Sequence, residues 1–253
     1  MFCEKCGKEV HDEAVVCVSC GCSLKSSPSK IEKIKDNSKR ANRLITILKI
    51  YLGLSIIDLL FGFYQYKVWS NHDFNPILDS WSAEYDFPDA IAFDIIYGVF
   101  WLVFLPIIIV TFIRFIKWFR RAYCNLNRLG IETDKKEGWA AGAWFIPFYN
   151  LVAPYLIMKE IWNKTQKYYK ENTEDTNILG VWWALWVAAN IITNQGDGIG
   201  SSFLGEGLET QTIITIIADI LWIPSTYVTI NLIKKVSFFE KEMYEKAVNT
   251  NNV

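Results

Sequence analysis

Long apolar blocks separated by polar connections dominate the sequence. Each block carries few charges and is close to the 20 residues that a helix needs, at 1.5 Å per residue, to cross about 30 Å of hydrocarbon. The third block is apolar mainly over 178–193 and needs a few flanking residues to reach that length. The pattern predicts four transmembrane helices, at about 44–66, 91–113, 177–195 and 211–233.

A fifth apolar stretch, 139–158, contains Pro147 and Pro154. Proline removes a backbone hydrogen bond and clashes with the preceding turn, so an unbroken spanning helix is unfavourable here. We expect a proline-broken helical hairpin that either re-enters the membrane or lies on its surface. Asn150 follows the first break and has two interpretations: it coordinates a ligand at the tip, or it satisfies backbone groups that the break leaves free.

Charged residues are distributed unevenly over the connections. Basic residues predominate in 23–43, 114–137, 159–170 and 234–246, whereas 67–89 and 194–209 are acidic. Positively charged connections stay on the cytoplasmic side of a membrane. All four basic segments can face the cytoplasm only if 139–158 does not cross. The charges therefore predict a multi-pass protein of the cell membrane with both termini in the cytoplasm.

The bulk composition agrees with this class. Of 253 residues, 51% are hydrophobic, the mean hydropathy is +0.15 and the formal net charge is -1. A chain without a basic excess is not expected to bind nucleic acid. The sequence has two histidines and no nucleophile with a recognisable base partner, so we expect no enzymatic activity. It opens on a polar, cysteine-bearing motif rather than on a secretory signal.

Two Cys-x-x-Cys pairs, each followed by a glycine, open the chain: Cys3, Cys6, Cys17 and Cys20. Glycine accepts the positive φ of a tight knuckle, and four thiolates complete a closed tetrahedral zinc site. Residues 1–24 are therefore predicted to be a zinc ribbon, folded by a structural Zn²⁺ because its few apolar side chains cannot form a core. The alternative is two disulfides. We interpret His11 and Cys22 as bystanders rather than as substitute ligands.

Three aspartates interrupt the predicted spans: Asp58, Asp94 and Asp219. The predicted topology places all three in the outer half of the bilayer, where they can converge. Carboxylates inside a membrane are costly and usually face a bundle interior or a wet cavity, so a cation or proton site is one hypothesis. The other is that Asp94 reaches the interface and the remaining two bond to Ser55, Thr215 or neighbouring backbone groups. With Asn150, these aspartates form the candidate intramembrane polar site.

Specific motifs lie in and around the fifth apolar stretch. They read Trp118-Phe119-Arg120-Arg121-Ala122-Tyr123, Gly138-Trp139, Trp144-Phe145-Ile146-Pro147-Phe148-Tyr149-Asn150, Pro154-Tyr155 and Met158-Lys159-Glu160-Ile161-Trp162. Through these motifs, residues 45–237 resemble the bacterial membrane family catalogued as domain of unknown function 4328. The resemblance implies a multi-helix domain of a bacterial inner membrane, and it lends no activity, substrate or catalytic residue. Residues 1–24 resemble the short zinc-ribbon heads of many bacterial and archaeal membrane proteins.

These observations predict an all-α membrane protein with four transmembrane helices, a proline-broken hairpin and a small N-terminal zinc ribbon. A basic tether, 25–43, joins the ribbon to the helical membrane domain, 44–237, and a cytoplasmic tail, 238–253, follows. We expect the tether to lie against anionic lipid headgroups and the ribbon to dock a protein partner. The leading hypothesis is a scaffold or regulatory interaction protein. The alternatives are a small ion or solute transporter or channel that uses the intramembrane carboxylates, and an intramembrane enzyme.

Overall fold

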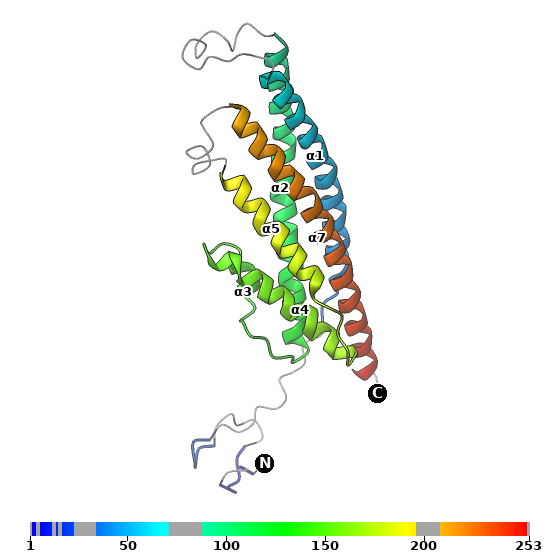
Figure 1. Cartoon of the computed structure of the whole chain (residues 1–253). Coiled ribbons are helices and arrows are strands. Elements are labelled where there is room, and N and C mark those ends of the chain that lie inside the picture. Colours follow the sequence, from blue (N-terminus) through cyan, green and yellow to red (C-terminus); the bar gives the residue numbers. More distant parts are fainter. Residues whose placement is uncertain are drawn as a thin grey trace.

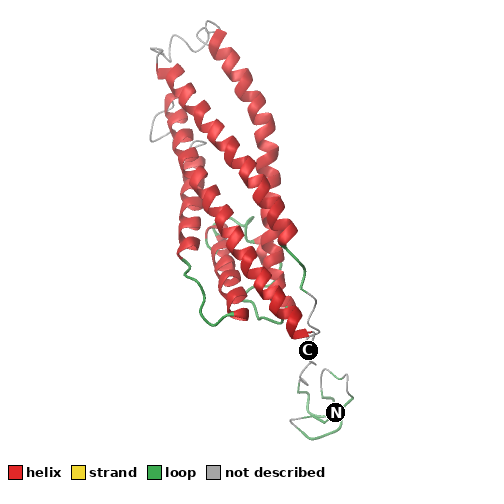
Figure 2. Ribbon diagram, turned by 90° about the vertical axis from the view of Figure 1, so that its right-hand side faces the viewer, coloured by secondary structure: helices red, strands yellow, loops and turns green. Residues whose placement is uncertain are grey.

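The structure, a computed structural model, describes residues 2–3, 6–11, 14, 17–22, 34–70, 88–195 and 208–251. Four helices form an antiparallel bundle (Figures 1 and 2): α1 (Ser38–Ser70), α2 (Pro88–Arg128), α5 (Asn177–Gln195) and α7 (Leu208–Asn251). The described residues contain no strand beyond an isolated bridge between Phe2 and Glu9. The predicted all-α class is confirmed.

Three of these helices, α1, α2 and α7, are long and apolar enough to cross a membrane, whereas α5 is a shorter apolar helix. The long helices extend beyond the apolar blocks and include the polar residues on either side of them. At the start of α1, Ser38 N donates to Asp36 Oδ1 at 2.8 Å. The predicted outer connections, 67–89 and 194–209, and residues 25–33 of the predicted tether lie largely outside the described residues.

The C-terminus of α2 is fixed by its own backbone. Gly130 has a φ of 73°, a left-handed conformation that glycine adopts without steric cost. Gly130 N donates to Asn127 O at 2.9 Å and Ile131 N donates to Leu126 O at 3.1 Å. This pair of bonds is a Schellman cap, and it turns the chain back toward the bundle.

The proline-containing stretch is a series of short turns rather than a spanning helix. It consists of α3 (Trp139–Gly142), a 3-10 turn η2 (Tyr149–Leu151) and then α4 (Ala153–Tyr169). Pro154 lies in the first turn of α4, where its missing N–H breaks no helical bond. Figure 1 shows α3 and α4 beside one half of the bundle, near the point where α2 ends.

The main hydrophobic core lies at the end of the bundle where α1 begins and α2 and α7 end, which we call the basic end. Its fully buried side chains come mainly from α2, α4 and α7: Trp118, Phe119, Tyr123, Leu126, Ile157, Met158, Ile161, Trp162, Leu232, Ile233, Val236 and Phe239. The rings of Trp162 and Phe239 meet edge to face, with centroids 4.9 Å apart. Residues 238–251 belong to α7 and also bury Met243 and Ala247, so the segment predicted as a tail packs on the bundle.

Candidate functional site

A cavity of about 500 Å³ lies between α1, α2, α5 and α7. Residues three or four apart lie on the same helix face, and each helix lines the cavity with one such face. From α1 these are Leu48, Tyr51, Ser55 and Asp58; from α7 they include Thr215, Asp219, Trp222, Thr226 and Thr229. Trp144, from the broken segment after α3, also lines the cavity.

Asp58 and Asp219 are the two carboxylates of this cavity, and they are only 4% and 7% exposed. Tyr97 Oη donates to Asp58 Oδ1 at 3.1 Å. Within the described part of the chain, Asp219 Oδ2 has no hydrogen-bond partner, and no lysine, arginine or histidine lines the cavity. An unpaired buried carboxylate is costly. Asp219 Oδ2 can therefore bind a proton, contact a cation or accept a hydrogen bond from water.

Other polar groups of the cavity also lack partners. Thr111 Oγ1 and Trp144 Nε1 are buried and make no hydrogen bond to any described residue. The hydroxyls of Ser55, Thr226 and Thr229 donate to the carbonyl one turn earlier in their own helices, at 3.0, 2.8 and 2.7 Å. Because a hydroxyl oxygen has two lone pairs, these groups can still accept a hydrogen bond from a ligand.

Aromatic side chains form much of the remaining wall: Tyr51, Trp101, Phe104, Phe112, Phe115, Trp144, Trp182, Trp186 and Trp222. Several pack edge to face, as do Trp144 and Trp186, whose ring centroids are 5.7 Å apart. The face of an aromatic ring attracts cations. A cavity lined by two carboxylates and many aromatic side chains can therefore attract a positively charged ligand and bury its apolar substituents.

The structure brings together only two of the four predicted polar-site residues. Asp94 is exposed on α2, one turn before Tyr97, and does not line the cavity. Asn150 lies in η2, half-buried and outside the cavity lining, and its backbone N–H donates to Ile146 O at 2.9 Å. Asp58 and Asp219 therefore line one cavity, whereas Asp94 and Asn150 lie outside its lining.

Sequence reasoning missed the aromatic members of the site and, apart from Ser55 and Thr215, its hydroxyl groups. On α7, Thr215, Trp222 and Thr226 recur at helical spacing around Asp219, and this periodicity was a usable signal. Trp144 gave no such signal, because it reaches the cavity from a turn whose path the sequence pattern does not define.

The N-terminal head consists of two similar knuckles. In the first, Gly7 N donates to Cys3 O at 2.8 Å and Cys3 N donates to Lys8 O at 2.9 Å; in the second, Gly21 N and Cys17 N make the same bonds to Cys17 O and Cys22 O at the same lengths. Gly7 and Gly21 have φ values of 68° and 65°, so both positions favour glycine. Cys22 thus occupies the place in the second knuckle that Lys8 occupies in the first.

The cysteine sulfurs of the head lie close enough together to hold a metal ion. Those of Cys3, Cys17, Cys20 and Cys22 are all within 4.8 Å of one another, and Cys6 Sγ lies 3.6 Å from Cys17 Sγ. All six cysteines of the chain are free, so the disulfide alternative gains no support.

Sulfur spacing separates Cys22 from the predicted ligands. In a tetrahedral site with Zn–S bonds of about 2.3 Å, neighbouring sulfurs lie roughly 3.8 Å apart. The distances of 3.7 Å from Cys3 to Cys20 and 3.6 Å from Cys6 to Cys17 fit this value. Cys22 Sγ lies closer, 3.1 Å from Cys20 Sγ and 3.3 Å from Cys3 Sγ. These two spacings fit zinc. The group of mutually close thiols contains Cys22 and not Cys6, so five thiols are available for four ligand positions.

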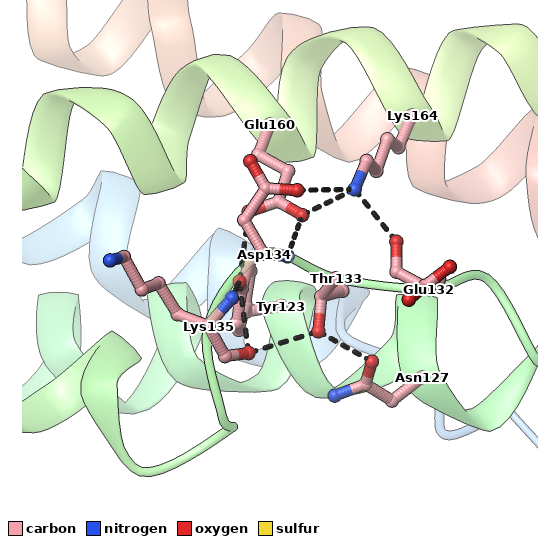
Figure 3. Close-up of polar contacts among 8 residues, drawn as sticks. All are labelled: Tyr123, Asn127, Glu132, Thr133, Asp134, Lys135, Glu160 and Lys164. Atoms are coloured by element: carbon pink, nitrogen blue, oxygen red, sulfur yellow. Dashed lines mark hydrogen bonds and ion pairs between the residues drawn. The ribbon is translucent and has the colours of Figure 1, made fainter.

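A buried polar cluster around Glu160 lies at the basic end (Figure 3). The Glu160 carboxylate accepts hydrogen bonds from Tyr123 Oη at 2.8 Å, Asp134 N at 2.7 Å and Lys164 Nζ at 2.6 Å. Partial burial alone would lower the pKa of Lys164, but the bonds to Glu160 and Asp134 outweigh it and raise that pKa above its usual value. The cluster ties α2, the loop after it and α4 together.

Glu240 of α7 is the acceptor of a second buried polar cluster. It is buried and accepts hydrogen bonds from Asn37 Nδ2 at 2.9 Å and Asn125 Nδ2 at 3.3 Å. Asn37 Nδ2 also donates to Trp118 O at 3.2 Å. These bonds join the start of α1 to α2 and α7, so Glu240 has a structural role that the sequence did not indicate.

Comparison with protein families matches residues 82–237 to the Domain of unknown function (DUF4328) family. This match covers more than half of the chain. The chain belongs to this family. The DUF4328 region begins at residue 82 rather than at 45, so α1 and Asp58 lie outside it, while Asp219 lies inside. No curated protein and no solved structure matches the chain.

The DUF4328 motifs occupy the basic end rather than the cavity. Trp118, Tyr123 and Trp162 are fully buried in the main core, and Tyr123 bonds to Glu160. Of the motif residues, Trp144 lines the cavity as well. The recognisable part of the sequence therefore reflects the packing of α2, α4 and the broken segment, and it says little about a ligand.

Proposed function

We propose that the membrane domain binds a hydrophobic organic cation in the cavity between α1, α2, α5 and α7 and carries it across the membrane. The observation that supports this is the presence of two buried carboxylates, Asp58 and Asp219, in one aromatic-lined cavity without a basic residue among its described lining. This places the transporter hypothesis ahead of the scaffold hypothesis that the sequence favoured. It requires no enzymatic activity.

An organic cation fits the wall better than a bare metal ion. Mg²⁺ and Ca²⁺ need six or more oxygen ligands at about 2.0–2.6 Å, in a compact shell. Here two carboxylates and scattered hydroxyls share a cavity of about 500 Å³ with many aromatic rings. Ring faces contribute cation–π attraction and bury apolar substituents, whereas they offer nothing to a small hydrated ion.

The topology proposed for this carrier has four crossings, with the basic end in the cytoplasm. It is supported by the antiparallel order of α1, α2, α5 and α7 and by the basic residues near the ends of α2, α4 and α7. Labelling of single cysteines introduced at Asn172 and Ser202 with a membrane-impermeant maleimide tests it. The two sites should react from opposite sides of the membrane, and reaction of both from one side would overturn the topology.

Equilibrium binding of tetraphenylphosphonium to the purified, detergent-solubilised protein tests the cation proposal. The wild-type chain should bind the probe saturably, at one site, and Asp219→Asn should weaken binding by at least about tenfold, because the carboxylate charge is lost in a low-dielectric site. Neutral triphenylphosphine oxide should not compete. Asp94→Asn is the matched control, because Asp94 is an exposed aspartate outside the cavity, and it should bind like the wild type. Unchanged binding by a variant carrying both Asp58→Asn and Asp219→Asn would refute the proposal.

The second candidate function is docking of a protein partner by the N-terminal head. In this hypothesis a structural Zn²⁺ folds the head, as the sequence predicts. Phe2 and Val18 are large apolar side chains that the knuckles leave exposed, and such residues suit a contact with a partner. Deletion of residues 1–24 should abolish recovery of partners with the protein while leaving tetraphenylphosphonium binding unchanged.

Zinc content tests the metal site separately. Cys6→Ser should release zinc from the purified chain, because Cys6 belongs to the set with tetrahedral spacing, whereas Cys22→Ser should retain one equivalent. The reverse result, with zinc lost from the Cys22 variant and kept by the Cys6 variant, would assign the fourth ligand to Cys22.

A further inference from the structure

A second cavity, of about 800 Å³, lies along α4 and combines two chemistries. Its apolar wall includes Phe148, Val152 and Leu156. Its polar wall includes Lys135, Lys159 and Lys167, together with Asp134 and Glu160, which both pair with Lys164. The cavity is separate from the one that holds Asp58 and Asp219, because none of its lining residues is shared with that site.

The two chemistries are ordered along the helix. Val152, Leu156, Lys159, Asn163 and Lys167 follow one another at steps of three or four residues, so they share one face of α4 and its N-terminal approach. Figure 1 shows that α4 starts beside α3, along the side of the bundle, and runs toward the basic end. The apolar residues therefore lie nearer the middle of the bundle, and the lysines lie at its basic end.

Not all of the lysines here are free to bind a ligand. Lys164 Nζ is engaged by Glu160, by Asp134 Oδ1 at 3.2 Å and by Glu132 O at 2.7 Å. Lys159 and Lys167 are exposed and have no acidic partner in the described part of the chain. Figure 3 shows the ammonium of Lys135 directed away from Glu160. Three ammonium groups thus remain available at one cavity.

Phe148 supports a role for the apolar wall. Its φ of 62° is an uncommon conformation for a bulky residue, and its side chain is 84% exposed. Val152 and Leu156 are exposed beside it. An apolar strip next to unpaired lysines matches the two halves of an anionic lipid, whose phosphate lies at the membrane surface and whose acyl chains point inward.

We propose that this groove binds one anionic phospholipid of the leaflet at the basic end, with its phosphate held by Lys159 and Lys167 and its acyl chain along Val152 and Leu156. The occupant is a membrane lipid rather than a soluble phosphate, because the apolar wall continues the charged one toward the middle of the bundle. This inference depends on the bundle lying in a membrane but not on the cation proposal.

Native mass spectrometry of the full-length protein tests it with dioleoylphosphatidylglycerol and, in parallel, dioleoylphosphatidylcholine. The wild-type chain should retain one phosphatidylglycerol in preference to phosphatidylcholine. Combined Lys159→Gln and Lys167→Gln substitutions should reduce this retention by roughly tenfold or more. Both lysines are exposed, so the fold should persist, and an unchanged melting temperature verifies this. Lys117→Gln, an exposed lysine on α2 outside the groove, is the matched control and should retain the lipid.

Three results would overturn the proposal. Equal retention of phosphatidylcholine would mean that the lysines do not select charge. Equal retention by the double lysine variant would place the lipid elsewhere. Displacement of the lipid by millimolar glycerol 3-phosphate would show that the site recognises a soluble phosphate and that the apolar wall is unimportant.

Discussion

Buried carboxylates at the basic end of the bundle and in the cavity differ in how many hydrogen bonds they accept. At the basic end, Glu160 and Glu240 each accept hydrogen bonds from two or more side-chain or backbone donors. Among the described residues, Asp58 in the cavity accepts a hydrogen bond from Tyr97, and Asp219 Oδ2 has no donor. All four side chains are less than a tenth exposed, so burial alone does not distinguish them.

The difference teaches which acids build the fold and which are available to a ligand. A satisfied buried carboxylate rigidifies the elements that donate to it, and its loss leaves those donors unpaired. An unsatisfied one costs stability in the ligand-free protein, and proteins retain such groups mainly at functional sites. Neutral substitutions at the two ends should therefore have opposite consequences for stability.

The largest effect is expected for Glu160→Ala. Removing this carboxylate leaves Asp134 N without its acceptor and takes the strongest of several acceptors from Tyr123 Oη and Lys164 Nζ, so the free energy of unfolding should fall by about 3 kcal/mol. Unfolding of the purified protein in mixed micelles measures this. Glu171→Ala, an exposed glutamate in the loop after α4, is the control and should change stability little. A loss as small as that of the control would mean that the Glu160 cluster does not hold α2 and α4 together.

Glu240→Gln should have the next largest effect. Its amide oxygen can still accept from Asn37 or Asn125, but the new NH₂ group faces two amide donors, so we expect a loss of about 1–2 kcal/mol. The same unfolding assay checks it. A combined Asn37→Ala and Glu240→Gln variant should lose less than the sum of the single losses, because both act on one network. Strict additivity would contradict the network.

Asp219→Asn should leave the free energy of unfolding unchanged or raise it by up to about 1 kcal/mol. The substitution removes a buried negative charge, and Oδ2 of this carboxylate has no hydrogen-bond partner among the described residues. Thermal unfolding of the ligand-free protein tests this directly. Destabilisation of the size expected for Glu160→Ala would contradict the distinction between the two ends of the bundle, because it would show that Asp219 also stabilises the fold.

The smallest effect concerns an exposed acid. Lys235 Nζ donates to Glu174 Oε2 at 3.0 Å, and this bond, with the charges of Lys235 and Lys170, holds the pKa of Glu174 below its usual value. The stabilisation is therefore present above the unfolded-state pKa and is lost as pH falls through the lowered folded-state pKa. Both side chains are about half exposed, so Glu174→Gln should cost less than about 0.5 kcal/mol at pH 7, and this cost should shrink on acidification. A cost that grows on acidification would reverse the sign and contradict this assignment.

The sequence predicted the helices well because long apolar blocks are strong local signals. Gly7 and Gly21 as knuckle glycines followed from a conformation that other residues rarely adopt. The two prolines similarly predicted that 139–158 would not form one helix. These features depend on residues close together in the chain.

The rest depends on contacts between distant segments. Asn37, Asn125 and Glu240 meet although Asn37 and Glu240 are 203 positions apart, and no local pattern pairs them. The same limit explains why the sequence identified Asp58 and Asp219 as candidate site residues but could not exclude Asp94 and Asn150 from the site. Which acid faces the cavity depends on the rotation of each helix, and a span with apolar residues on every side does not define that rotation.

The most direct test of the central claim is a crystal structure of the protein with tetraphenylarsonium, located by the anomalous scattering of arsenic. The proposed function predicts one strong anomalous peak inside the cavity, beside the carboxylates of Asp58 and Asp219 and enclosed by the rings of Trp144 and Trp186. A peak confined to the outer surface of the bundle, or none at a saturating concentration, would contradict it.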